Sequence, residues 1–236
     1  MKKSHIATLI VFFVLIPLTL IVGSRLSGRA FYVTSTLVIV ELLIPFFLAF
    51  EGRRPQAREL VVLAVMCALA VAGRVAIPIP SFKAIFGIIM IAGIAFGPES
   101  GFLVGAISAL ASNFFYSQGP YTPWQMMAYG AGGMLAGFVF AEGRLPRKPV
   151  VMGIFGFLAV TFFVGSLLDT CSVFLVMSRI SLKGAMAFYI SGFPVNLRQA
   201  VATAIVLLVL GKPLLEKLDR IKTKYGILDD EGGKET

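Results

Sequence analysis

The sequence predicts an all-α, polytopic membrane protein folded as a helical bundle, and three observations support this. Of the 236 residues, 58% are hydrophobic and 14% are charged, whereas soluble domains are about half apolar and about a quarter charged. Apolar runs of about 20 residues, the length needed to cross a hydrocarbon core of roughly 30 Å, follow one another along the chain. The segments between them are short, so we expect no soluble catalytic or nucleotide-binding domain.

Eight apolar runs are the predicted spans. They cover residues 6–23, 31–50, 60–77, 82–97, 101–116, 124–141, 150–170 and 188–211. A charged break at 51–59 separates two runs rich in Leu, Ile, Val and Phe from six shorter runs rich in Gly and Ala. We therefore expect a two-helix transmembrane extension over 1–56, a six-helix core over 57–225 and a polar cytoplasmic tail over 226–236.

The basic residues indicate the orientation in the membrane. Most of the 21 Lys and Arg residues lie in the N-terminal segment, around 53–58, around 144–148 and in the tail, which the spans place on one side. The positive-inside rule makes this side cytoplasmic and puts both termini there. The net charge of +9 then reflects cytoplasmic loops and anionic lipid rather than nucleic acid. We interpret the first span as an uncleaved helix rather than a signal peptide.

Small residues recur at four-residue spacing, which lets membrane helices approach closely. The stripes are Ala64, Ala68, Ala72 and Ala76; Gly101, Gly105, Ala109 and Asn113; and Gly133 with Gly137. Gly97 and Pro98 predict a tight cytoplasmic hairpin between the fourth and fifth spans. Residues 171–187 are expected to form a longer external segment, a lid or an interfacial helix. Cys67 and Cys171 are expected to be buried and unpaired.

Polar residues inside membrane spans are costly, so each is a functional candidate. Most of them fall at the external ends of the predicted helices, where they would converge on one outward-facing pocket. The predicted substrate-binding residues are Arg74, Asn113, Tyr116, Gln118, Trp124, Gln125, Asp169, Asn196 and Arg198. Trp124 could equally be an interfacial belt residue, and Arg198 could neutralise Asp169 instead of binding ligand. Glu41, midway along the second span, has either a structural or a proton-coupling role.

Several chemistries are not supported by the sequence. His5 is the one histidine, so neither a histidine-based metal site nor a Ser-His-Asp constellation can be assembled. No P-loop motif occurs, so uphill transport would need an ion gradient or a partner. We expect no enzyme activity, no cofactor and no metal. Pro194 frees backbone carbonyls beside Asn196, which in lipid requires protein or a water-filled cavity nearby.

Three stretches of the core, together with the segment at the end of its last helix, resemble the substrate-binding S components of energy-coupling factor (ECF) vitamin transporters. Residues 64–68 resemble the AxxxA docking motif of that family, and residues 96–101 with Asn113 resemble its hairpin. The segment 119–126, which reads G-P-Y-T-P-W-Q-M, resembles a G-P-x-T-P-W-Q-M segment of one subgroup, and residues 211–218 resemble the tail after the last helix. The resemblance covers about residues 57–225 and leaves the two leading helices unexplained.

The resemblance implies a partner assembly and a substrate class. The S component would capture a vitamin from outside, dock on a membrane T component driven by two cytoplasmic ATPases, and topple to release the vitamin inward. Ala64, Ala68 and Ala72 would form the docking face. The gating loop would be Pro78, Ile79, Pro80 and Ser81. The subgroup makes a corrinoid such as cobalamin the first expected ligand, with another water-soluble vitamin next.

Two other functions remain open from the residues. A stand-alone ion-coupled secondary transporter or channel could use Glu41 and the Asp169/Arg198 pair, although two clear repeats are missing. A membrane-embedded enzyme would need a nucleophile or metal cluster that the sequence does not supply. Transport by the chain alone would support the secondary transporter or channel. Loss of turnover on replacing Asp169 would support the enzyme.

Overall fold

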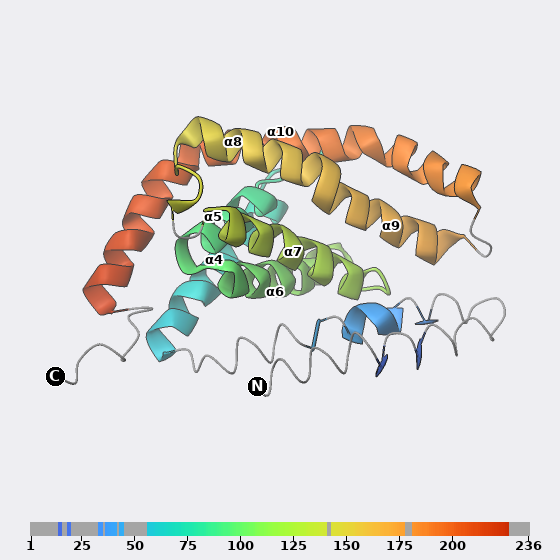
Figure 1. Ribbon diagram of the computed structural model, residues 1–236, viewed down its shortest axis with the longest axis horizontal. Helices are drawn as coiled ribbons and strands as arrows, with labels where there is room; N and C mark the ends of the chain where they lie inside the picture. The colour runs from blue at the N-terminus through green and yellow to red at the C-terminus, as the bar shows by residue number, and fades with distance from the viewer. Residues whose placement is uncertain are drawn as a thin grey trace.

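The computed structural model describes residues 14–15, 18–19, 33–34, 36–41, 43–44, 56–140, 143–177 and 181–226. These residues form helices joined by short connections and contain no strand, which confirms the all-α prediction (Figure 1). The helices are α4 (Ala57–Val75), α5 (Ile85–Phe96), α6 (Pro98–Tyr116), α7 (Thr122–Phe140), α8 (Pro149–Leu158), the π-helix η3 (Ala159–Val164), α9 (Gly165–Val176) and α10 (Leu182–Tyr225).

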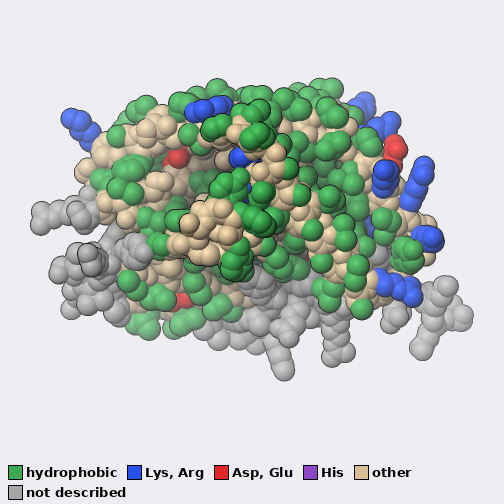
Figure 2. All heavy atoms as spheres, turned by 180° about the vertical axis from the view of Figure 1, so that it is seen from behind, with side chains coloured by type: hydrophobic (Ala, Val, Ile, Leu, Met, Phe, Trp, Pro, Cys, Tyr) green, Lys and Arg blue, Asp and Glu red, His purple; other side chains and the backbone are tan. Residues whose placement is uncertain are grey.

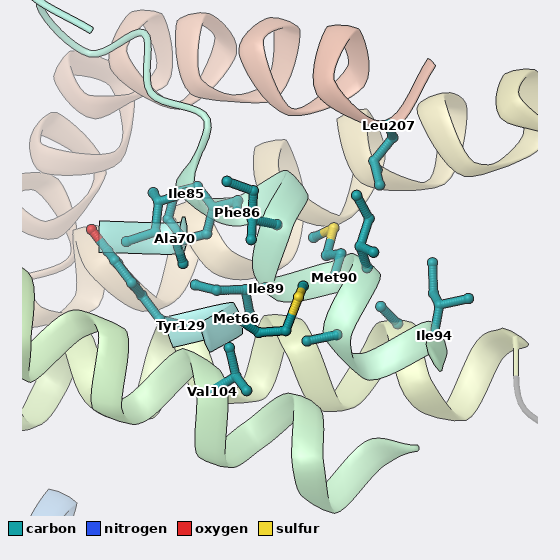
Figure 3. Close-up of a cluster of buried hydrophobic side chains, with 14 of the residues drawn as sticks. Met66, Ala70, Ile85, Phe86, Ile89, Met90, Ile94, Val104, Tyr129 and Leu207 are labelled. Atoms are coloured by element: carbon teal, nitrogen blue, oxygen red, sulfur yellow. The ribbon is translucent and has the colours of Figure 1, made fainter. Parts of the chain in front are cut away.

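Helix α5 lies at the centre of the bundle, and all twelve of its residues are buried. Helices α4, α6, α7 and α10 surround it and contribute most of the main core. Figure 3 shows side chains of α5 meeting those of its four neighbours. The labelled residues are Met66, Ala70, Ile85, Phe86, Ile89, Met90, Ile94, Val104, Tyr129 and Leu207. A helix that is apolar on every side is typical of such a central position.

The predicted hairpin after α5 is present. Gly97 alone separates α5 from α6, and its φ of 93° is a conformation that glycine adopts without a Cβ penalty. Pro98 follows as the first residue of α6, where its missing N–H costs no helical hydrogen bond. The turn is therefore encoded locally by this Gly-Pro pair.

The glycine stripes of α6 and α7 form a close helix contact, as their spacing predicts. A Cβ on Gly101 would lie 2.5 Å from the carbonyl oxygen of Gly133, and one on Gly105 would lie 2.4 Å from that of Tyr129. Gly93 of α5 meets the same Gly133 carbonyl, where a Cβ would come within 2.1 Å. The backbones of α5, α6 and α7 thus approach one another at Gly133. Such a close approach is possible because glycine has no side chain.

The helices on either side of the predicted external segment 171–187 are longer than expected and take up most of it. Helices α8, η3 and α9 run without a break from Pro149 to Val176, and α10 already begins at Leu182. Polar residues in this region do not end the helix because their hydroxyls bond to carbonyls one turn earlier. Thr170 donates to Ser166 at 2.7 Å and Ser172 donates to Leu168 at 3.3 Å.

Helix α10 is much longer than the predicted span 188–211. Its 44 residues correspond to about 66 Å at about 1.5 Å per residue, more than twice a hydrocarbon core. It begins where the Ser181 hydroxyl accepts from the Gly184 amide at 3.1 Å, and it contains Pro194 and Pro213. The red C-terminal part runs in a different direction from the orange part in Figure 1, and a proline inside a helix is a usual cause of such a bend.

The C-terminal part of α10 is attached to the end of α5. Lys222 donates to the carbonyl of Ala95 at 2.7 Å, and Arg147 donates to the carbonyl of Ile94 at 3.1 Å. Arg147 also pairs with Asp219 at 3.4 Å. Two cations therefore lie at the carboxyl end of α5, where free carbonyls and the helix dipole favour positive charge.

Membrane-spanning length is clearest in the last helices. In the described part of the chain, Pro149–Val176 and Leu182–Tyr225 are long and apolar enough to cross a membrane by themselves. Helices α4, α6 and α7 each have 19 residues, about 28 Å of helix. The α5 segment of 12 residues is shorter than the predicted span 82–97.

The N-terminal extension, predicted as two transmembrane helices, is described in part and stays a prediction. Within the second predicted span, residues 33–34, 36–41 and 43–44 are helical. Of the first span, 6–23, the described positions are 14–15 and 18–19, and the rest lies outside the described residues. The polar tail after Gly226 lies outside them too.

Basic side chains gather at one end of the molecule. Figure 2 shows them on the right, where the C-terminal part of α10 and the connection before α8 lie. The members of this basic end are Arg144, Arg147, Lys148, Lys212, Lys217, Arg220, Lys222 and Lys224. Much of the remaining surface in this view is hydrophobic.

Candidate functional site

Arg74 links α4 to α6 at the end of the bundle opposite the basic end. It lies in the last turn of α4 and donates through Nη1 to Ser112 and, at 2.8 Å, to Oδ1 of Asn113. Its guanidinium also lies over the rings of Tyr116, at 4.9 Å, and Tyr129, at 5.6 Å. Among the described residues no carboxylate pairs with Arg74, so amide and hydroxyl oxygens and two aromatic faces hold its charge.

Asn113 extends this network to α7. It is fully buried, and its Nδ2 donates to Oε1 of Gln125 at 2.8 Å and to the Thr122 hydroxyl at 3.2 Å. The Tyr116 hydroxyl donates back to the carbonyl of Arg74 at 3.0 Å. Arg74, Asn113, Tyr116 and Gln125, all predicted from sequence, are therefore brought together, and we call them the Arg74 network.

The loop between α6 and α7 is built around Thr122. The Thr122 hydroxyl accepts from the Gly119 amide at 3.1 Å and donates to Oε1 of Gln118 at 2.9 Å. Gln118 also donates to the carbonyl of Leu110 at 3.0 Å, and its side chain is exposed. The segment 119–125 thus places Gln125 against Asn113. Through Thr122 and Gln118, the hydrogen bonds continue from Asn113 to the surface.

The predicted gating loop lies beside this network. Pro78, Ile79 and Pro80 are exposed, and Ser81 has a φ of 59° in a turn in which Phe82 donates to the carbonyl of Ile79 at 3.3 Å. The ends of the loop are fixed. Ala84 donates to the carbonyl of Gly73 at 3.1 Å, and the Lys83 ammonium, bonded to the Ile77 carbonyl, lies 5.9 Å from the Tyr116 ring centroid.

Trp124 is separate from the hydrogen-bonded network, although it precedes Gln125. Its ring stacks on Phe174 of α9 at 5.5 Å and is 8% exposed. Cys171 and the partly buried Tyr121 pack in the same apolar cluster. The Trp124 Nε1 atom is buried and has no hydrogen-bond partner among the described residues.

Asp169 and Asn196 pair with each other across α9 and α10. Asn196 donates from Nδ2 to Oδ2 of Asp169 at 2.8 Å, and both side chains are buried. Each lies against a glycine of the opposite helix, because a Cβ would come 2.5 Å from Asn196 at Gly165 and 2.1 Å from Asp169 at Gly192. Asp169 is therefore not neutralised by Arg198, which corrects that interpretation.

Arg198 does not reach the Arg74 network. Its side chain is exposed on α10, and Nε donates to the carbonyl of Pro194 in its own helix at 3.2 Å. Gln199, the next residue, holds a buried Oε1 without a partner in the described part of the chain. A role of Arg198 in ligand binding remains a prediction.

The alanine stripe of α4 faces outward. Ala64, Ala68 and Ala72 are exposed, and the neighbouring Val61, Val65 and Leu69 are 63%, 53% and 43% exposed. The opposite face, with Leu63, Met66 and Ala70, is buried in the core. This helix therefore presents an exposed apolar face on which small alanines alternate with Val61, Val65 and Leu69.

Four contributors to the site were not predicted from sequence: Ser112, Thr122, Tyr129 and Lys83. Tyr129 lies four residues after Gln125, so the same helical face carries both, and this spacing could have identified it. Ser112 adjoins Asn113 and Lys83 follows the gating loop, which are weaker signals. Both cysteines are unpaired and buried, as predicted. Among the described residues, no three His, Cys, Asp or Glu side chains could together hold a metal ion.

Comparison with known proteins identifies the family. No curated protein and no solved structure matches the chain significantly. The family described as ECF-type riboflavin transporter, S component, matches residues 55–216, which include α4 to α9 and most of α10. This match covers more than half of the chain and begins where the predicted six-helix core begins. The chain therefore belongs to the family of ECF-type riboflavin transporter S components, the substrate-specific membrane subunits of ECF transporters.

Proposed function

We propose that this chain captures a water-soluble vitamin or related micronutrient outside the cell and delivers it with a T component and two ATPases. The Arg74 network carries the proposal. It joins the ends of three helices through hydrogen bonds of 2.8–3.2 Å and leads from the buried Asn113 to the exposed Gln118. A few convergent polar groups among aromatic side chains are typical of small-molecule sites.

The distribution of charge supports an outward-facing site. The Arg74 network lies where α4 and α6 end and α7 begins, whereas the basic end lies after α7 and in the last turns of α10. Because α4, α6 and α7 each approach the thickness of a bilayer, the two groups lie near opposite membrane surfaces. The positive-inside rule then makes the basic end cytoplasmic and the network external.

The chemistry of the network narrows the ligand class. Arg74, without a carboxylate partner among the described residues, favours electron-rich ligand atoms, and the amides of Asn113 and Gln125 supply donors and acceptors. The ring of Tyr116 in the network, and the ring of Trp124 outside it, favour a flat, unsaturated surface. Riboflavin, which the family description names, and a corrinoid, which the segment 119–126 favours, are the two ligands to test first.

A binding titration tests this function directly. The full chain, purified in detergent, is titrated by calorimetry with riboflavin, cobalamin and a panel of other water-soluble vitamins. Binding of one ligand at nanomolar Kd without ATPase subunits supports capture by this chain and identifies the substrate. If the folded protein binds none of them, the proposal is wrong for this ligand class.

We further propose that the alanine stripe of α4 is the docking face for the T component. Ala64 and Ala68 are exposed, so leucines there would project outward without disturbing the core, yet they would prevent close helix approach. The double variant Ala64→Leu, Ala68→Leu should bind ligand normally and fail to co-purify with the T component and ATPases. Ala187→Leu, at an exposed alanine of α10, is the matched control. Assembly by the double variant would refute the assignment.

A further inference from the structure

The described helical residues between 33 and 44 in the N-terminal extension present three distinct faces. Ile39 and Leu43, one turn apart, are 5% and 6% exposed. Val33, Leu37, Val40 and Ile44 form a second stripe and are 41–51% exposed. Glu41 lies on the side opposite Ile39 and Leu43, as expected from about 100° per residue. The segment therefore packs through one face and leaves a separate apolar face exposed, which in a membrane would meet lipid.

The packing face is seated on the core. Leu43 packs with Phe102 and Ala106 of α6 and with methionines of α7. Opposite it, the Thr19 hydroxyl donates to Oε1 of Glu41 at 2.6 Å, which ties the two halves of the extension together. Figure 1 shows the described part of this segment beside the first turns of α7. The described residues around Leu43 are therefore packed on the bundle.

Ile39 packs directly in the Trp124 cluster. Its buried neighbours are Trp124 of α7 and Cys171 of α9, and the partly buried Tyr121, Met127 and Phe174 surround them. Since Trp124 and Phe174 belong to different helices, Ile39 covers the seam between α7 and α9 beside their stacked rings. The side chain of one extension residue thus forms part of the wall around a predicted ligand-binding residue.

Trp124 carries an unused hydrogen-bond donor inside this wall. Its Nε1 is buried and unpartnered within the described residues, while the ring is 8% exposed. An indole N–H in an apolar environment is costly without an acceptor, so buried tryptophans usually have one. A ligand acceptor atom would satisfy it. A tryptophan of the interfacial belt directs its N–H to water or lipid headgroups. The buried Nε1 therefore argues against a belt role for Trp124.

We infer that the described part of the second predicted span, through Ile39, forms the lateral wall of the ligand site, with Ile39 sealing Trp124 from lipid and fixing the ring for a ligand. The inference rests on the proposed function. The ligand it fits presents a hydrogen-bond acceptor, such as a ring carbonyl or carboxamide oxygen, at the edge of an unsaturated ring system. Ile39 and its helical neighbours lie outside the matched region 55–216, so this wall is an addition to the shared core.

The experiment uses Trp124 as a unique reporter, since the chain contains one tryptophan. The full-length protein is placed in bilayers containing brominated lipid, which quenches tryptophan fluorescence on contact. Ile39→Ala removes the cover over Trp124, whereas Leu43→Ala removes a similar apolar contact one turn away and Leu37→Ala alters the lipid face. Ile39→Ala should raise quenching clearly and weaken ligand affinity about tenfold, the effect of losing one apolar contact in a pocket. Both control variants should keep wild-type quenching.

The outcomes separate the wall from the function. Unchanged quenching in Ile39→Ala overturns the inference, and so does raised quenching with unchanged affinity, because Ile39 would then cover Trp124 without lining the site. If Leu43→Ala raises quenching as much as Ile39→Ala does, the inference is also overturned. Any loosening of the extension would then expose Trp124, and Ile39 would have no special role. If the wild type binds no vitamin, the proposed function fails, while the quenching comparison still decides whether Ile39 covers Trp124. Ile39→Val keeps most of the side chain, so its quenching and its ligand affinity should both stay near the wild-type values.

Discussion

Replacing Arg74 with Ala should destabilise the protein measurably even without ligand. The substitution leaves the fully buried Oδ1 of Asn113 without its donor, whereas Ser112 keeps its bond to the carbonyl of Ala109 at 3.1 Å. One unsatisfied buried acceptor costs about 1–3 kcal/mol. The contacts with two tyrosine rings add about 0.5–2 kcal/mol. Since no described carboxylate pairs with Arg74, the substitution leaves no partner charge unpaired, and the expected loss is roughly 1.5–5 kcal/mol.

Unfolding in detergent, followed by Trp124 fluorescence, measures this loss. Arg74→Lys retains a charge beside the tyrosines but cannot reproduce the fork of donors, so it should recover about half of the stability. Ser112→Ala is the matched control, because it removes one Arg74 contact and leaves Asn113 satisfied; it should cost at most about 1.5 kcal/mol. An Arg74→Ala protein within about 0.5 kcal/mol of wild type would refute the reasoning, since surface changes have that size.

Three further substitutions test the packing around the site. Gly133→Ala should lower the free energy of unfolding by about 1–3 kcal/mol or prevent folding, because the new Cβ would lie 2.3 Å from a backbone oxygen. In the same unfolding assay Gly132→Ala should have a smaller effect, because its Cβ would meet a valine side chain at 2.8 Å. Lys222→Ala should make the C-terminal part of α10 more sensitive to protease, whereas Lys224→Ala, at an exposed position, should not. Asp169→Asn should preserve folded yield because an amide oxygen still accepts from its partner, whereas Asp169→Ala should lower it; equal yields would show that the pair contributes little.

Much of the core was predictable because its signals are local. The turn at Gly97 follows from residues beside it, and the stripe of Gly101 and Gly105 follows from helical periodicity alone. The end of α9 and the length of α10 were missed for the opposite reason. Prolines and polar residues usually interrupt apolar runs, yet Pro194 and Pro213 lie inside α10, where packing of residues such as Leu207 and Leu215 holds the helix together.

Convergence of the site was predictable, but partner choice was not. Arg74 and Asn113 both lie near the ends of predicted helices that finish on one side, so they had to approach each other. Which cation or amide meets Asp169, by contrast, depends on the register of α9 against α10.

Glycines set that register. Gly165 lies four residues before Asp169, and Gly192 lies four residues before Asn196, so in an antiparallel pair each polar side chain faces the glycine of the other helix. This reciprocal spacing positions Asn196, rather than Arg198, opposite Asp169. Glycine spacing on two helices can therefore identify polar partners across a membrane helix pair, where the charges of the side chains alone suggest a different pairing.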